Sequence, residues 1–207
     1  MIKDNIIYTI GHSNYSFEQL LKRIEKYKIN VIVDIRGIPY SKYNVQFNKE
    51  DLAIELRKLG YVYIYMAKEF AAKRTTRESY NKEGYADFNM VKNEPFFKNG
   101  IERLKIGLEK GYNIVLLGAM QEPIRCHRAI LVGRELDKLG FNIKHILHNE
   151  ELATQEDIET MLLEKYFPNR NQLTIDNLLG ENKNDSMLIE EGYRLANKEI
   201  GYRMEKL

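Results

Sequence analysis

Short apolar runs alternate along this chain with segments whose apolar residues recur at helical spacing. Runs with the length of buried strands occur at residues 6–10, 31–33, 114–117 and 143–147, and residues 61–65 alternate as in a further strand. Between them, apolar residues lie three or four positions apart, as they do on one face of a helix. Strands that alternate with helices predict an α/β fold, with a mostly parallel sheet and helices on both of its faces.

Polar residues mark where several of these helices begin. Ser16 is followed three residues later by Gln19, which is the pattern of a capping box. Asn48 is expected to cap a helix that ends before Gly60, and Pro95 stands at the start of another. The segment between residues 66 and 90 is the least regular, and it carries several basic residues. So long a connection is usually functional or mobile.

The pattern changes near residue 149. Beyond it the apolar residues predict helices at about residues 154–166 and 185–207, and no strand is suggested. We therefore predict an α/β core domain at residues 1–149 and a helical extension at residues 150–207, packed on the core or on a partner chain. Because no candidate chemical group lies in the extension, we expect it to be separable from the site.

Composition narrows the class of protein. The chain has 207 residues, of which 43% are hydrophobic and 30% charged, with a single cysteine and a formal net charge of +2. These values suit a soluble protein in a reducing cytoplasm, without an internal disulfide. No apolar run approaches the roughly 20 residues of a membrane-spanning helix, and no signal peptide is expected. The weak net charge neither requires nor excludes nucleic acid.

Candidate functional residues follow three of the predicted strands. In parallel sheets with right-handed crossovers, the loops after the strands meet at one edge, and ligands bind there. Three of these loops carry polar side chains: His12 and Ser13, then Asp34 and Arg36, and finally the triplet of residues 126–128. We therefore expect these side chains to converge in one pocket.

The triplet contains the only cysteine, Cys126, followed by His127 and Arg128. The start of a helix and neighbouring cations lower the pKa of a thiol, so Cys126 is a candidate nucleophile or redox group. The alternative is a half-buried packing residue. His12 is a candidate general base, or else a structural residue whose ring binds a backbone carbonyl. Asp34 is likewise either a base or half of an internal ion pair.

Arginines are the candidate ligands for an anion. Arg36 and Arg128 can each present two parallel donors to a phosphate or a carboxylate, although arginines that only cover a loop are common. A metal site built from histidine, aspartate and cysteine is not predicted, because Cys126 and His127 would diverge on a helix. The sequence has no paired zinc-ligand spacing and no glycine-rich phosphate loop, and it identifies no cofactor.

Several short motifs are specific when taken together. They lie, in order, at residues 9–13, 34–36, 39–48, 84–88, 126–128 and 145–146. With these motifs the chain resembles the domain-of-unknown-function family 488. The resemblance implies an α/β domain of unassigned activity, and it supports the same strand-end site. The third motif adds Asn44 and Asn48 to the candidate substrate-binding residues, beside Ser13, Arg36 and Arg128.

The chain departs from this family at one strand end. Members often carry Cys-Ala-Glu there, whereas this chain has Gly118, Ala119 and Met120. A carboxylate that could act as a base, or orient His127, is therefore missing. Glu122 could take its place if the turn brings it close enough.

These observations favour an enzyme with a strand-end cleft for a small anionic or phosphorylated substrate, such as a nucleotide or a nucleic-acid end. Cys126 would be the nucleophile or redox group, and His12 or Asp34 would be the base. One alternative is a nucleic-acid- or anion-binding module without turnover, in which the basic loop at residues 68–82 contacts phosphates and Tyr43 and Tyr80 stack on bases. Another is an interaction protein whose C-terminal helices recruit a partner.

Overall fold

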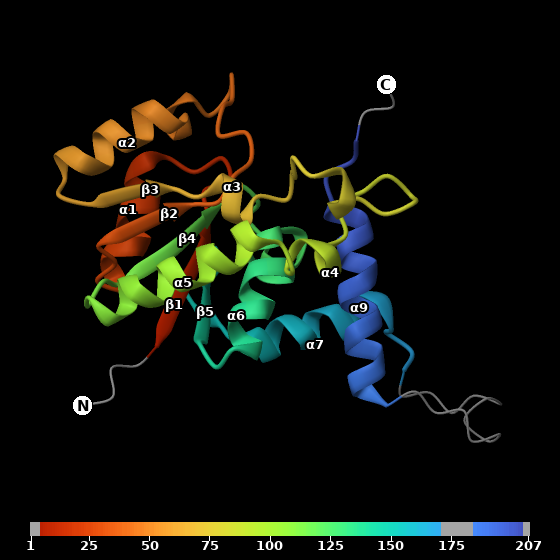
Figure 1. The fold of residues 1–207 in the computed structure, drawn as a ribbon. Coiled ribbons are helices and arrows are strands. Elements are labelled where there is room, and N and C mark those ends of the chain that lie inside the picture. Colours follow the sequence, from red (N-terminus) through yellow and green to blue (C-terminus); the bar gives the residue numbers. More distant parts are fainter. Residues whose placement is uncertain (1–4, 171–183, 205–207) are drawn as a thin grey trace, which may run out of the picture.

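The computed structural model describes residues 5–170 and 184–204. Its centre is a six-stranded sheet in the order β3-β2-β4-β1-β5-β6, in which all neighbours are parallel except β5 and β6 (Figure 1). The predicted α/β fold with a mostly parallel sheet is thus confirmed. The strands are β1 (Ile6–Gly11), β2 (Val31–Asp34), β3 (Val62–Tyr65), β4 (Ile114–Gly118), β5 (Asn142–Ile146) and β6 (Leu152–Ala153).

Helices cover both faces of the sheet, as predicted. On one face lie α1 (Phe17–Lys26) and α2 (Lys49–Lys58), whose apolar side chains pack on Val115 and Leu117. The neighbouring positions Ile114 and Leu116 point to the opposite face, because successive side chains of a strand alternate. That face is covered by α5 (Pro95–Glu109), α6 (Arg134–Lys138), α7 (Gln155–Tyr166) and α9 (Asp185–Ile200).

The start of α2 differs from the prediction. Asn48 occupies the N-cap position, but its side chain makes no cap hydrogen bond. Its Oδ1 instead accepts the backbone N–H of Ser41 at 2.7 Å, which ties the preceding loop to the helix. The capping box of α1 is present as predicted, with Ser16 and Gln19 exchanging hydrogen bonds.

The C-terminal part packs on the core of its own chain. A buried chain of hydrogen bonds runs from Thr9 of β1 to the His145 ring (2.8 Å), on to Gln155 of α7 (3.0 Å) and then to Tyr193 of α9 (2.8 Å). Both predicted helices are present, although α9 ends at Ile200 and residues 201–204 are not helical as predicted. β6 is a short strand that the sequence did not predict. The polar link predicted between the helices lies mostly outside the described residues.

The sheet order places three strand ends side by side. The neighbours β2, β4 and β1 are consecutive in the sheet but not in the chain, so their following loops meet where the strand order changes. Such a switch point is where open α/β sheets bind ligands. Two short helices, α3 (Ala67–Phe70) and α4 (Phe88–Val91), lie in the irregular connection after β3.

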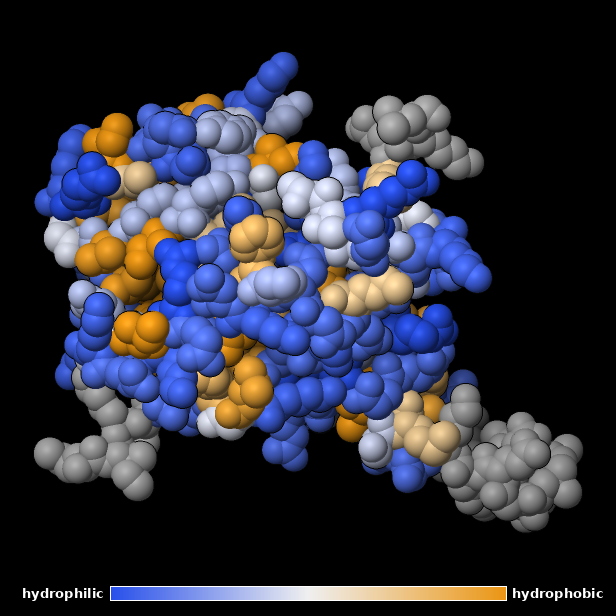
Figure 2. All heavy atoms as spheres, viewed as in Figure 1, coloured by the Kyte–Doolittle hydropathy of each residue, from blue (hydrophilic) through white to orange (hydrophobic). Residues whose placement is uncertain are grey.

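The face of the molecule that points toward the viewer in Figures 1 and 2 is mostly hydrophilic. Its apolar side chains gather mainly on the left (Figure 2). Within residues 5–170 and 184–204, no helix has the length and apolar character needed to cross a membrane.

Candidate functional site

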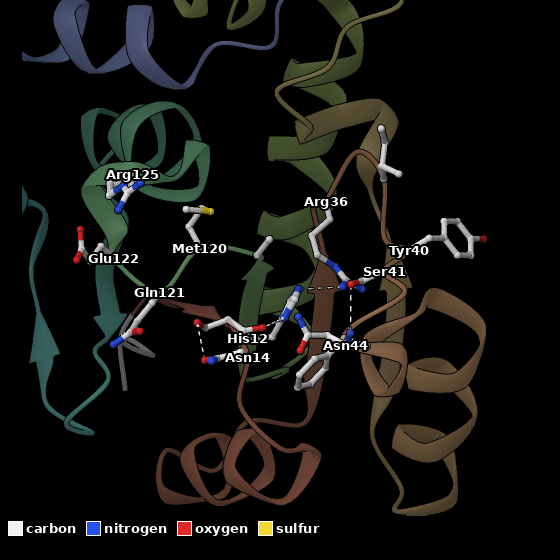
Figure 3. A pocket seen from close by; sticks show the side chains of 14 residues that line it. His12, Asn14, Arg36, Tyr40, Ser41, Asn44, Met120, Gln121, Glu122 and Arg125 are labelled. Atoms are coloured by element: carbon white, nitrogen blue, oxygen red, sulfur yellow. Dashed lines mark hydrogen bonds between the residues drawn. The ribbon is translucent and has the colours of Figure 1, made fainter.

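A cleft with two lobes lies at the carboxyl ends of β1, β2 and β4. The first, which we call the His12 lobe, has a volume of about 500 Å³ and is lined by His12, Ser13, Asn14, Ser41, Asn44 and Gln121 among others (Figure 3). The second, the Cys126 lobe, has a volume of about 490 Å³ and is lined among others by Cys126, His127, Lys73, Glu199 and Tyr202. The two lobes share Arg36, Ile38, Ala119, Met120 and Arg125.

The loop after β1 is tied to the loop after β4. The backbone N–H of His12 binds the Gly118 carbonyl at 3.1 Å, and that of Ser13 binds the Ala119 carbonyl at 2.9 Å. Ser13 has a φ of 48°, a left-handed conformation that costs a residue with a side chain free energy. Glycine is required at position 11, two residues earlier, because a Cβ there would lie 1.8 Å from the Met120 carbonyl oxygen. The two loops therefore form one rigid floor.

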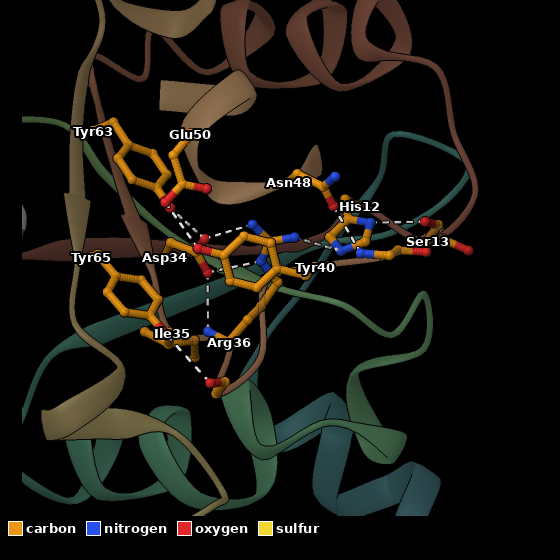
Figure 4. Close-up of polar contacts among 12 residues, drawn as sticks. His12, Ser13, Asp34, Ile35, Arg36, Tyr40, Asn48, Glu50, Tyr63 and Tyr65 are labelled. Atoms are coloured by element: carbon orange, nitrogen blue, oxygen red, sulfur yellow. Dashed lines mark hydrogen bonds and ion pairs between the residues drawn. The ribbon is translucent and has the colours of Figure 1, made fainter. Parts of the chain in front are cut away.

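Asp34 and Arg36 form a buried ion pair at the end of β2 (Figure 4). The carboxylate accepts the Arg36 Nε at 2.9 Å, its Nη2 at 2.6 Å and its backbone N–H at 3.0 Å, as well as the Tyr63 hydroxyl at 2.6 Å. Asp34 is fully buried and lines neither lobe. Its contacts orient Arg36, whose guanidinium lines both.

His12 is held between two partners. Its Nδ1 lies 2.8 Å from the carbonyl oxygen of Ser13, which can only accept, so Nδ1 carries the proton. Its Nε2 then accepts Nη1 of Arg36 at 3.1 Å, and its ring packs on Phe47 with centroids 4.5 Å apart. Burial, together with the charge of Arg36, lowers the pKa of His12 to about 4. The ring is therefore neutral near pH 7, and Nε2, the nitrogen without a proton, accepts the hydrogen bond from Arg36.

Cys126 and His127 are neighbours whose side chains meet. Cys126 has an extended backbone, with φ −136° and ψ 137°, after a single 3₁₀ turn at Pro123–Arg125. The divergence expected on a helix therefore does not occur, and Sγ lies 3.8 Å from Nδ1 of His127. The other ring nitrogen, Nε2, lies 2.9 Å from the carbonyl of Ile35. That carbonyl requires a proton on Nε2 and leaves Nδ1 to face the sulfur.

The surroundings of Cys126 favour its thiolate. Burial alone disfavours the charge and is the largest single influence. The charges of Arg128 and His127, with hydrogen bonds from the His127 ring and the Arg128 backbone, outweigh it and lower the pKa of Cys126 to about 5. Burial also disfavours a charged His127, but the adjacent thiolate raises the pKa of that imidazole. The pair is therefore poised as a thiolate and an imidazolium.

Arg128 lies beneath the cleft. It is fully buried, at the start of a π-helical segment (Arg128–Gly133), and it lines neither lobe. Its Nη2 donates to the Gln121 carbonyl at 2.8 Å and its Nη1 to the Met120 carbonyl. Arg128 thus fixes the loop after β4 and supplies positive charge near Cys126, whereas the sequence placed it against the ligand.

The loop after β2 supplies the two asparagines. Asn44 lines the His12 lobe, and its side chain does not cap the 3₁₀ turn that follows it (Val45–Phe47). Asn48 lines neither lobe and holds Ser41 through the bond described above. Asn44 can therefore reach a ligand directly, whereas Asn48 acts through the loop.

The Cys126 lobe includes residues that sequence reasoning did not place at the site. Lys73, Arg125 and Tyr202 line it, and Lys73 lies over the Tyr202 ring at 5.0 Å. Glu199 of α9 also lines it and pairs with Lys165 at 2.5 Å. The C-terminal segment, in which the sequence predicted no site residue, thus contributes residues to the pocket. Only the basic character of the loop containing Lys73 hinted at this arrangement in the sequence.

The carboxylate that the family often carries after β4 is not replaced by Glu122. That side chain is exposed and lines the His12 lobe, not the Cys126 lobe (Figure 3). Met120 lies in the view between Arg125 and Arg36. Among the residues that the structure describes, no three histidine, cysteine, aspartate or glutamate side chains are grouped to hold a metal ion.

Comparison with known proteins identifies the family. The family described as "Domain of unknown function DUF488" matches residues 16–134, which is more than half of the chain. The match includes the ion pair after β2 and the triplet that begins at Cys126. No curated protein and no solved structure matches the chain. The chain thus belongs to the DUF488 family of α/β domains, whose function is unassigned.

Proposed function

We propose that this protein is an enzyme that uses Cys126 as a nucleophile on a small anionic or phosphorylated substrate. The observation that carries the proposal is the contact between Cys126 and His127. In its neutral form the His127 ring presents a nitrogen without a proton to the sulfur at 3.8 Å, because the Ile35 carbonyl requires the ring proton on the other nitrogen. His127 can therefore take the thiol proton and give the thiolate–imidazolium pair described above. A nucleophile beside an oriented base is the general arrangement for covalent catalysis.

The proton path follows from this tautomer. His127 Nδ1 takes the thiol proton, so Sγ becomes a thiolate, which is the nucleophilic form of cysteine. When Sγ bonds to an electrophilic atom of the substrate, the imidazolium can return the proton to the leaving group. The base is then His127 and not His12 or Asp34, the two bases predicted from the sequence, because the polar atoms of those two are engaged by Arg36.

The anionic group is expected in the Cys126 lobe. Lys73 and Arg125 line it, and within the described part of the chain neither forms an ion pair. Arg36 is neutralised by Asp34 but still has donors to offer, since three of its five guanidinium N–H groups are used. An anion in this lobe would lie beside the Cys126 thiolate. Lys73 and Arg125 would also offset the repulsion between these two negative charges.

A second candidate is a binding module without turnover. The low exposure of Cys126, 3%, favours it, because a nucleophile must be reached. In that case Tyr43, which is 92% exposed, remains available to stack on a base. Tyr80 is less suited, since its hydroxyl bonds to the backbone of Arg74. Phosphate contacts would fall to exposed cations such as Arg77 and Lys82.

The rate of Cys126 alkylation, measured against pH, distinguishes the enzyme from the binding module. The enzyme requires a reactive thiolate, so the rate with iodoacetamide should be constant from pH 6 to 8 and decline only near pH 5. A midpoint near the ordinary thiol value of about 8.5, or no reaction in the folded protein, would contradict the proposal. Nucleic-acid binding that weakens steeply with salt would then support the binding module.

A further inference from the structure

The two lobes of the cleft differ in charge. In the Cys126 lobe two cations, Lys73 and Arg125, are not neutralised by an ion pair within residues 5–170 and 184–204, and the carboxylate of Glu199 is paired with Lys165. The ionic groups of the His12 lobe instead offset one another. Arg36 is paired with Asp34, and the carboxylate of Glu122, which lines this lobe only, balances the charge of Arg125, which lines both lobes. Lys73 is therefore the cation that distinguishes the Cys126 lobe.

The histidine of the His12 lobe adds no charge. Burial and Arg36 lower its pKa to about 4, so it is neutral near pH 7. The lobe therefore offers an anion little net attraction, although its volume of about 500 Å³ lies within the range of roughly 300–1,000 Å³ for small-molecule sites. Its ligand should be uncharged and polar.

The polar side chains of this lobe can both donate and accept hydrogen bonds. Asn44 and Gln121 carry amides for which no partner exists among the described residues, and Asn14 and Asn44 flank His12 (Figure 3). Ser41 Oγ accepts two backbone N–H groups, from Tyr43 and Asn44, each at 3.1 Å, so its own hydrogen remains to be donated. Hydroxyl groups, which donate and accept at once, match such a surface.

We infer that the His12 lobe binds the hydroxyl-bearing, uncharged part of the same substrate whose anionic group enters the Cys126 lobe, so that the substrate class is a sugar phosphate. Arg36 would lie between the uncharged part and the anionic part of this substrate, since it lines both lobes. The position of the anionic group rests on the proposed function. The inference adds that the other half of the substrate is a sugar. A free sugar phosphate and a nucleotide share this chemistry.

Calorimetry on the full-length protein tests the inference, with inorganic phosphate, ribose 5-phosphate and adenosine 5′-monophosphate as ligands. Ribose 5-phosphate should bind at least tenfold more tightly than phosphate. Asn44→Ala should abolish that difference without changing phosphate binding, and the exposed, distant Asn89→Ala should change neither. Further tightening with the nucleotide would identify it as the source of the sugar, and equal binding would identify the free sugar phosphate.

Equal affinities for phosphate and ribose 5-phosphate, no effect of Asn44→Ala, or no measurable binding of either ligand would overturn the inference. Cys126 alkylation, measured on the same samples, separates this failure from failure of the proposed function. A thiol with an ordinary pKa, together with tenfold tighter ribose 5-phosphate binding, would remove the catalytic proposal and leave the sugar-phosphate site in place.

Discussion

His127 lies with Nδ1 at 3.8 Å from Cys126 Sγ and with Nε2 at 2.9 Å from the carbonyl of Ile35. The two residues are adjacent in the chain, and only the change from an extended backbone at Cys126 to a helical one at His127 brings their side chains together. The Ile35 carbonyl comes from the loop after β2, whereas His127 follows β4. Residues from the ends of two strands therefore make Nδ1 of His127 the proton acceptor for Cys126.

His127→Gln should raise the pKa of Cys126, because it removes the imidazolium and its hydrogen bond to the sulfur. The alkylation midpoint, about 5 in the native protein, should move up by at least one pH unit, since one unit corresponds to about 1.4 kcal/mol. The rate of iodoacetamide modification against pH measures this. The exposed His148→Gln is the matched control and should leave the midpoint unchanged. An unchanged midpoint in His127→Gln would remove the base from the mechanism.

Stability should fall on acidification, and His12 should contribute beside the buried His145, whose pKa is lowered to about 3. The pKa of His12 is about 4 in the folded protein and 6.5 for the ordinary side chain, so between these values the unfolded chain binds more protons. The free energy of unfolding should therefore be highest above pH 6.5 and fall as the pH drops towards 4, by about 3 kcal/mol from this group. Urea denaturation at several pH values measures it. His12→Asn should have a shallower dependence over this range, and an identical dependence would contradict the burial of a neutral ring.

Gly11→Ala should destabilise the floor of the site. The added Cβ would lie 1.8 Å from the Met120 carbonyl oxygen, a backbone atom that cannot move without displacing the loop held by Arg128. Overpacking of this kind costs about 1–3 kcal/mol. Gly107→Ala in α5 is the control, because its nearest neighbour is the end of the Ile114 side chain. Equal unfolding midpoints for the two variants would show that the loop after β4 is free to shift.

Arg74→Met should cost far more stability than Arg77→Met. Arg74 is buried, pairs with Glu94 and donates to three backbone carbonyls, whereas Arg77 is exposed. Breaking a buried pair by removing one partner costs about 3–5 kcal/mol, because the other charge is left uncompensated. Surface changes usually stay within about 0.5 kcal/mol. Guanidinium denaturation of the two variants compares them, and similar losses would show that Arg74 does not hold the loop.

Local patterns in the sequence determined the fold class and the edge of the sheet where the site lies. Apolar runs predicted β1, β2, β4 and β5, and alternation predicted the edge strand β3. The run is clearest in β4, because a strand buried on both faces must be apolar at nearly every position. The capping box of α1 was likewise readable, since its two hydrogen bonds join residues three positions apart. The convergence of loops after β1, β2 and β4 followed from the rule that parallel strands share a direction.

Only the tertiary structure decided which polar groups face the cleft. The sequence placed Arg128 against the ligand, but the loop after β4 folds over it and uses its donors for carbonyls. It placed Lys73 only in the irregular basic loop and gave Glu199 no role, yet both line the Cys126 lobe. It assigned Cys126 to a helix, where it could not have met His127. These outcomes depend on contacts between distant segments and on one backbone conformation, and neither leaves a periodic signal in the sequence.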